Sequence, residues 1–278
     1  MLYLVLAIAS SAMVAIIMRL SAGKVRSNIT MLATNYLTCL LLGAWYAGFH
    51  LFPFRSTGFS ATAAMGAFNG MLYLLGFILL QYNTRKNGLV LSSVFIKLGL
   101  LVPMVLSVFL FAEIPTGVQC IGFVLAVCAI VMINYEKGTS FSGGKLPLIL
   151  MLLAGGGGDA MSKVFEVYGL ADHADLFLFY TFVSAFLLCV ALILWKRERP
   201  EAYALLFGAL VGIPNFFSAK FLLMALNRLP AVIVYPTFSV ATVLVVTLTG
   251  VCLFKERLRQ LQWAALMLIL SALILLNL

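Results

Sequence analysis

Two segments of the chain carry the same pattern of residues. Leu110–Asn134 has the sequence LFAEIPTGVQCIGFVLAVCAIVMIN, and Leu253–Asn277 has the sequence LFKERLRQLQWAALMLILSALILLN. A shift of 143 residues superimposes seven identities in one register, which are Leu110, Phe111, Glu113, Gln119, Leu125, Ala129 and Asn134. Self-similarity in a single register is the signature of an internal repeat. The pattern therefore predicts that the chain arose by tandem duplication.

Further pairs extend the repeat toward the N-terminus of each copy. The motif Gly66-Ala67-x-x-Gly70 recurs 142 residues later as Gly208-Ala209-x-x-Gly212, and Arg19 corresponds to Lys163 at a distance of 144 residues. We predict two copies, residues 1–138 and residues 139–278, that together form one membrane domain.

Composition assigns the chain to the membrane. Its 278 residues are 64% hydrophobic and only 10% charged, and the mean hydropathy is +1.12. Soluble domains are about 45–50% apolar and about 25% charged, so a soluble or disordered protein is excluded. The net charge of +9 does not indicate nucleic-acid binding, because the basic residues do not gather on a polar domain.

Apolar runs of the length that crosses a bilayer, about 20 residues, alternate with short polar or Gly/Pro-rich connections. The run from Leu2 to Met18 has no basic segment before it, so we expect a retained helix rather than a cleaved signal. The sequence predicts an all-α integral membrane protein with ten transmembrane helices, five in each copy, over residues 2–20, 28–49, 60–82, 87–111, 117–134, 146–168, 174–195, 202–226, 230–253 and 259–277.

The distribution of basic residues predicts the orientation. Connections after odd-numbered helices hold thirteen Lys and Arg residues, and those after even-numbered helices hold two. Because short cytoplasmic loops are enriched in Lys and Arg, we expect both termini on the non-cytoplasmic side. Five helices per copy is an odd number, so the second copy enters the membrane from the opposite side. Inverted-topology repeats are typical of transporters that work by alternating access.

The chain resembles the drug/metabolite transporter superfamily, specifically its EamA-type bacterial members. The resemblance rests on ten helices in about 280 residues, the five-plus-five repeat, and the Leu-Phe-x-Glu connection before the last helix of each copy. Arg19 and Lys163 are similar to a basic residue that is common late in the first helix of each repeat. Pro236 stands where the family has a proline in the fourth helix, whereas Pro103 of the first copy lies farther along. The resemblance implies a bacterial inner-membrane transporter, with export as the default direction.

Lys97 is the most informative candidate site residue. It lies about 15 Å beyond the Arg85-Lys86 pair on a helical rise, near the middle of a span. An ammonium group at that depth costs several kcal/mol unless it is paired or hydrated. We interpret Lys97 as an anion-binding group in a central cavity, with a structural pair on a neighbouring helix as the alternative.

Other charges within spans are weaker candidates. Asp159 and Lys163 are spaced i, i+4 on one helix face, which predicts either mutual neutralisation or a proton-coupling role for Asp159. Lys220 is a candidate substrate ligand, with snorkelling of its ammonium to the surface as the alternative. By analogy with the central cavity of the family, the substrate-binding set also includes Asn69, Tyr73, Asn215, Phe216 and Tyr235.

Glycine-rich stretches within spans predict close packing. Gly155–Gly158 does not have the spacing of a phosphate-binding loop, and we expect either close helix approach or a local helix break there. The Gly66/Gly70 and Gly208/Gly212 pairs predict helix–helix contacts of the small-x-x-x-small type.

Cysteines and histidines give no cofactor or metal site. The five cysteines lie within apolar runs without a C-x-x-C pair and are interpreted as small buried hydrophobes. His50 and His173 are far apart in sequence, which argues against a metal site.

We therefore expect a secondary transporter, and not an enzyme, whose partners are the lipid bilayer and a small-molecule substrate such as an amino acid or organic anion. A monomer or homodimer is expected, with no nucleic acid or cofactor. The alternative function is a flippase for a lipid or lipid-linked headgroup.

Overall fold

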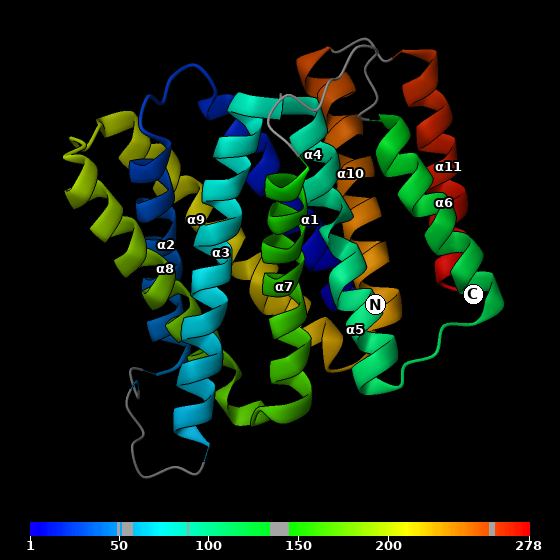
Figure 1. Ribbon diagram of the computed structural model, residues 1–278, viewed down its shortest axis with the longest axis horizontal. Coiled ribbons are helices and arrows are strands. Elements are labelled where there is room, and N and C mark those ends of the chain that lie inside the picture. The colour runs from blue at the N-terminus through cyan, green and yellow to red at the C-terminus, as the bar shows by residue number, and fades with distance from the viewer. Residues whose placement is uncertain (49–50, 52–57, 88, 134–144, 256–258) are drawn as a thin grey trace. The chain divides into compact units, whose positions relative to one another are not determined.

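The computed structural model describes residues 1–48, 51, 58–87, 89–133, 145–255 and 259–278, and every regular element in those ranges is a helix. Figure 1 shows the α-helices and the chain order. Their bounds, with those of two 3₁₀ turns, are α1 Leu2–Ser21, α2 Asn28–Tyr46, α3 Phe59–Asn87, α4 Leu89–Lys97, η1 Leu98–Leu100, α5 Leu101–Phe111, α6 Gly117–Ile133, α7 Leu146–Tyr168, η2 Ala171–His173, α8 Ala174–Lys196, α9 Ala202–Leu226, α10 Ala231–Phe254 and α11 Gln260–Leu276.

Each predicted transmembrane span corresponds to a helix or, for residues 87–111, to the consecutive elements α4, η1 and α5. In the described ranges, eight helices are long and apolar enough to cross a membrane, and α6 and α11 are shorter apolar helices. The predicted all-α membrane fold is confirmed.

α3 continues five residues past its predicted end, because its polar last turns find partners. The buried Asn83 donates from Nδ2 to the carbonyl oxygens of Leu79 and Pro147, at 2.8 and 2.9 Å, and Asn87 Nδ2 donates to Asn83 Oδ1 at 2.9 Å. These contacts replace the water that a polar segment otherwise requires, so the helix ends at Asn87 rather than at residue 82.

The fourth predicted span is interrupted where the sequence predicted one continuous helix. The turn η1 separates α4 from α5, and Pro103 follows three residues after Leu100. Proline has no N–H and its ring crowds the carbonyl four residues earlier, which here is that of Gly99. The α-helical ladder therefore tightens into a 3₁₀ turn at residues 98–100.

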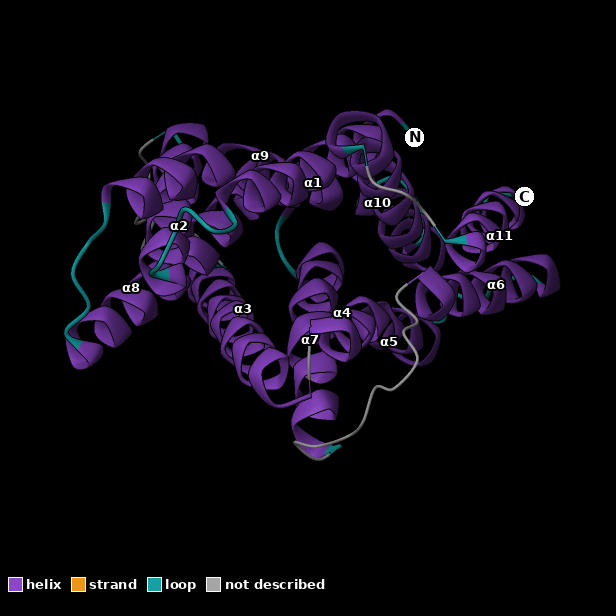
Figure 2. Ribbon diagram, turned by 90° about the horizontal axis from the view of Figure 1, so that it is seen from above, coloured by secondary structure: helices purple, strands orange, loops and turns teal. Residues whose placement is uncertain are grey.

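The described chain divides into two compact units. Unit 1 comprises Met1–Leu74 and Met161–Asn227, and unit 2 comprises Leu75–Ala160 and Arg228–Leu278. In unit 1, α2 packs against both α8 and α9, and α1 packs against α9; in unit 2, α6 packs against α11, as Figure 2 also shows, and α10 packs against α5. Each unit thus combines helices from both predicted copies, and the copies at 1–138 and 139–278 stay a prediction.

The repeated glycine pairs make corresponding contacts in unit 1. A Cβ atom on Gly70 of α3 would lie 2.3 Å from the carbonyl oxygen of Thr181 on α8. A Cβ atom on Gly212 of α9 would lie 2.7 Å from the carbonyl oxygen of Asn35 on α2. The predicted glycine packing is confirmed: the third helix of each copy packs on the second helix of the other.

The Leu-Phe-x-Glu repeat has a local structural explanation. Ala112 and Lys255, its x positions, end α5 and α10 in the left-handed conformation, both at φ 53°. At the start of the next helices, Gln119 Oε1 and Gln262 Oε1 each accept a backbone N–H three residues earlier, at 3.0 Å. The segments share a turn and a helix cap; their residues Asn134 and Glu256 lie outside the described ranges, and the inverted relation of the copies stays a prediction.

Candidate functional site

Lys97 is the last residue of α4, immediately before the η1 turn. It lies about 12 Å along the helix from Leu89, from the rise per residue, and its side chain is exposed. The sequence predicted that this ammonium lies deep within a span. In the structure, the α-helix ends at Lys97 and is followed by the 3₁₀ turn η1. Discontinuous membrane helices often line transport sites.

The glycine run of α7, Gly155–Gly158, packs closely against the segment around Lys97. A Cβ atom on Gly156 would lie 2.1 Å from the Gly99 carbonyl oxygen, and one on Gly155 would lie 3.1 Å from Ile96 Cδ1. The predicted close approach is confirmed. The alternative of a break in this helix is wrong, because α7 is continuous from Leu146 to Tyr168; glycine keeps its N–H and so preserves the ladder that Pro103 interrupts in the neighbouring helix.

This close approach brings Lys97 and Asp159 into one neighbourhood of unit 2. Lys97 precedes Gly99 by two residues, and Asp159 follows Gly156 by three. Their charges interact electrostatically. Within the described ranges, neither the Lys97 ammonium nor the Asp159 carboxylate makes a hydrogen bond or an ion pair closer than 4.0 Å. The two opposite charges therefore interact without a direct contact in the described part of the chain.

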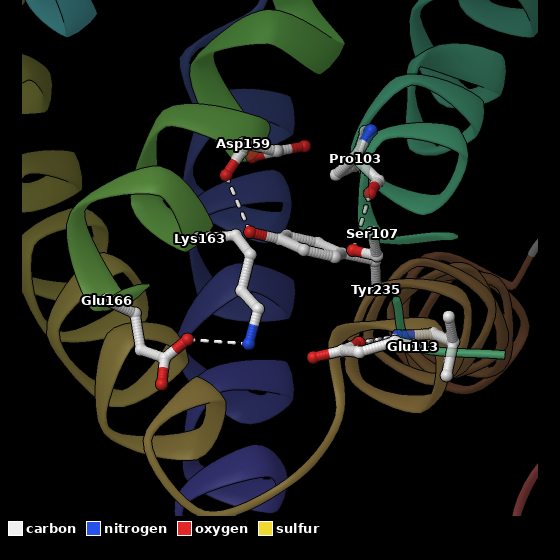
Figure 3. A network of polar contacts seen from close by, with 8 residues as sticks. Pro103, Ser107, Glu113, Asp159, Lys163, Glu166 and Tyr235 are labelled. Carbon is white, nitrogen blue, oxygen red and sulfur yellow. Dashed lines mark hydrogen bonds and ion pairs between the residues drawn. The ribbon is translucent and has the colours of Figure 1, made fainter. Parts of the chain in front are cut away.

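Tyr235 on α10 forms a hydrogen bond to Asp159 on α7. Its ring is almost completely buried, and its hydroxyl donates to the Asp159 carbonyl oxygen at 2.6 Å (Figure 3). Near the start of α10, Glu113 Oε2 accepts the backbone N–H of Val232 at 3.2 Å. These contacts position Tyr235. Its hydrogen bond uses the backbone carbonyl of Asp159, so the Asp159 carboxylate takes no part in it.

Lys163 forms an ion pair one turn along α7. Its Nζ lies 2.6 Å from Glu166 Oε2 (Figure 3), and the side chain of Lys163 is 7% exposed. The sequence predicted either mutual neutralisation of Lys163 and Asp159 or a proton-coupling role for Asp159. In the structure Lys163 pairs with the i, i+3 carboxylate of Glu166, which lies on the same helix face.

Lys220 is held by two partners in unit 1. Its Nζ lies 2.7 Å from Asp175 Oδ1 on α8 and 3.5 Å from the ring centroid of Tyr46 on α2. An ion pair combined with a cation–π contact stabilises a partly buried ammonium. The sequence did not find this arrangement, because Asp175 follows a connection and Tyr46 lies 174 residues before Lys220.

The predicted polar and aromatic residues of unit 1 make helix contacts. Asn215 Nδ2 donates to Asn35 Oδ1 at 3.2 Å, and Asn69 Nδ2 donates to Thr181 Oγ1 at 3.4 Å. In the described part of the chain, Asn69 Oδ1 is a buried atom without a hydrogen-bond partner.

Two predicted aromatic residues join the core of unit 1. The rings of Tyr73 and Phe216 pack against Phe182, at centroid distances of 6.4 and 6.2 Å. Phe216 is completely buried.

The predicted site residues thus fall into two groups. Lys97, Asp159 and Tyr235 belong to unit 2. Asn69, Tyr73, Lys163, Asn215, Phe216 and Lys220 belong to unit 1. Their role in substrate binding stays a prediction. Gly99 and Pro103, which shape the surroundings of Lys97, were missed, although their i, i+4 spacing within an apolar span is a recognisable signal for a helix break.

The cysteines are only partly as predicted. Cys39 and Cys189 are buried, whereas Cys120, Cys128 and Cys252 are exposed on helix surfaces. Surface positions suit small apolar side chains in a membrane protein, because lipid, not water, covers them. His50 lies outside the described residues.

Comparisons with known proteins agree with the fold. Residues 146–278 match the EamA-like transporter family. An uncharacterized protein of Haemophilus influenzae (strain ATCC 51907 / DSM 11121 / KW20 / Rd) is 25% identical over 282 residues, covering 97% of this chain and 95% of that protein. A solved structure described as the crystal structure of a protein superimposes on this chain with a TM-score of 0.75. The two chains are 14% identical, and the match covers 99% of this chain and 94% of the other. The resemblance drawn from the sequence is confirmed for residues 146–278, which are similar to the EamA-like transporter family, and the apolar helices of the described ranges fit a multi-pass membrane protein.

Proposed function

We propose that this transporter carries a small organic anion or amino acid across the bacterial inner membrane, by alternating access between its two repeats, with export as the ordinary direction. The observation that carries the proposal is Lys97, an exposed ammonium within a membrane-spanning segment, without a hydrogen-bond partner in the described ranges. A charge inside the membrane is costly, and such residues commonly mark substrate pathways.

The chemistry of the site favours anions over cations. An ammonium attracts a carboxylate or phosphate, while the acid in its neighbourhood, Asp159, already interacts with Lys97. The first helix, α1, contains no acidic residue, so it offers no carboxylate for a cationic drug. A carboxylate-bearing solute is therefore the expected substrate class.

The test is a thermal-shift screen of the purified full-length protein. The panel is lactate, succinate, glutamate, inorganic phosphate, the cation tetraphenylphosphonium and the headgroup glycerophosphoglycerol, each with wild type and Lys97→Ala. A ligand that binds the native state raises its Tm by mass action, by an amount equivalent to about 2.7 kcal/mol at a hundred times Kd.

We expect at least one organic anion to raise the Tm of wild type but not that of Lys97→Ala. Asp175→Asn is the control, because it removes a carboxylate that pairs with Lys220 in unit 1 and leaves Lys97 with its own surroundings. Stabilisation only by the cation or the headgroup would contradict the proposal, as would an equal anion response in Lys97→Ala.

A further inference from the structure

Asp159 is the feature of the site that anion binding alone does not use. In unit 2 it lies on α7 beside Lys97, held there by the packing of Gly99 on Gly156. Lys97 and Asp159 together carry no net charge, and they interact without a direct ion pair in the described ranges. An anion that binds to the Lys97 ammonium therefore lies near the Asp159 carboxylate.

Insertion of an anion changes the charge balance of this pair. A monoanion on Lys97 leaves a net charge of minus one, with two negative groups close together in a segment that spans the membrane. Like charges at short range disfavour each other's ionised form. Uptake of one proton by Asp159 restores a net charge of zero.

We propose that Asp159 takes up a proton when an anion binds to Lys97, so that anion and proton bind, and cross the membrane, together. The balance is complete: the ammonium and the carboxylate, plus an anion and a proton, become an ammonium–anion pair beside a neutral carboxylic acid. No other reactant is needed. The proposal rests on the proposed function and adds its coupling ion.

We assign the change of charge to Asp159 because of the contacts that the groups around it make. From α4 it meets Lys97, and from α10 it meets Tyr235, whose hydroxyl donates to the backbone carbonyl of Asp159. On α7 itself, Lys163 is paired with Glu166 at 2.6 Å. At the start of α10, the Glu113 carboxylate accepts the Val232 N–H.

Coupling of this kind has a direct consequence for transport. Movement of one monoanion with one proton is electroneutral, so the membrane potential does not drive it. Export then proceeds only while the outward anion gradient exceeds the inward proton gradient.

The test is the pH dependence of anion binding to the full-length protein. Lactate and glutamate are the probes, because their own net charges stay constant between about pH 6.5 and pH 8.5, well above carboxyl pKa values. Linkage to one proton makes the wild-type Kd rise up to roughly tenfold per pH unit on the alkaline side. Asp159→Asn, a neutral isostere of the protonated acid, is expected to bind the same probe with a Kd that does not change with pH.

Asp175→Asn is the control and is expected to keep the wild-type slope, because Asp175 pairs with Lys220 in unit 1 and not with Lys97 or Asp159. A second readout is difference infrared spectroscopy: the carboxylic-acid C=O band gained on probe addition should be present in wild type and absent in Asp159→Asn. Probe binding independent of pH in wild type, or an unchanged slope in Asp159→Asn, would overturn the coupling and leave the anion site intact. Failure of both probes to bind at any pH would overturn the anion site itself, and the coupling with it.

Discussion

At the scale of single residues, two intramembrane ammonium groups differ in their surroundings. Lys220 has a carboxylate at 2.7 Å and an aromatic face at 3.5 Å. Lys97 has an electrostatic partner but makes no hydrogen bond within the described ranges. Both were predicted as substrate ligands, because a sequence shows the depth of a charge but not its partners on distant helices. The contacts favour a structural role for Lys220 and a binding role for Lys97.

Lys220→Gln should lower stability without removing the anion response. A double-mutant cycle of Lys220→Gln with Asp175→Asn should give a coupling of about 1 kcal/mol, the upper range for partly exposed ion pairs. The measurement is Tm for the four proteins, with and without the stabilising anion. An unchanged Tm together with a lost anion response would instead make Lys220 a substrate ligand.

At the scale of elements, periodicity and length predicted where helices lie, while local irregularities followed from contacts. The apolar runs located the spans within a few residues, because bilayer thickness fixes helix length. The end of α3 depended on the partners of Asn83, and the η1 turn depended on Pro103 and Gly99. The site could be predicted only as single residues, because the pairing of Lys97 with Asp159 depends on which helices pack together.

The glycine contact between α7 and η1 gives a prediction for packing. Gly156→Ala would place a Cβ atom 2.1 Å from a backbone oxygen, so it should force the helices apart and destabilise the protein by about 2 kcal/mol. Gly76→Ala is the matched control on α3, because its Cβ atom would meet Gly155 at an ordinary 3.6 Å. Thermal unfolding in detergent measures both, and a Tm of Gly156→Ala equal to that of Gly76→Ala would contradict the close approach.

At the scale of the whole molecule, the internal repeat predicted from the sequence is the basis of the proposed mechanism. Gly66 and Gly70 lie at the contact of α3 with α8, and Gly208 and Gly212 lie at the contact of α9 with α2, so helices of one predicted copy pack on helices of the other. Alternating access requires two similar halves that exchange conformations around a shared site. The opposite orientation of the copies, with both termini outside the cytoplasm, stays a prediction from the charge distribution.

The measurement that tests the transport claim most directly is counterflow of radiolabelled lactate and glutamate in proteoliposomes, with scrambling of a fluorescent phospholipid followed in the same vesicles. We predict saturable uptake of a labelled anion by wild type, its loss in Lys97→Ala, and no scrambling above that of protein-free vesicles. Lipid scrambling without solute uptake would contradict the account and favour a flippase.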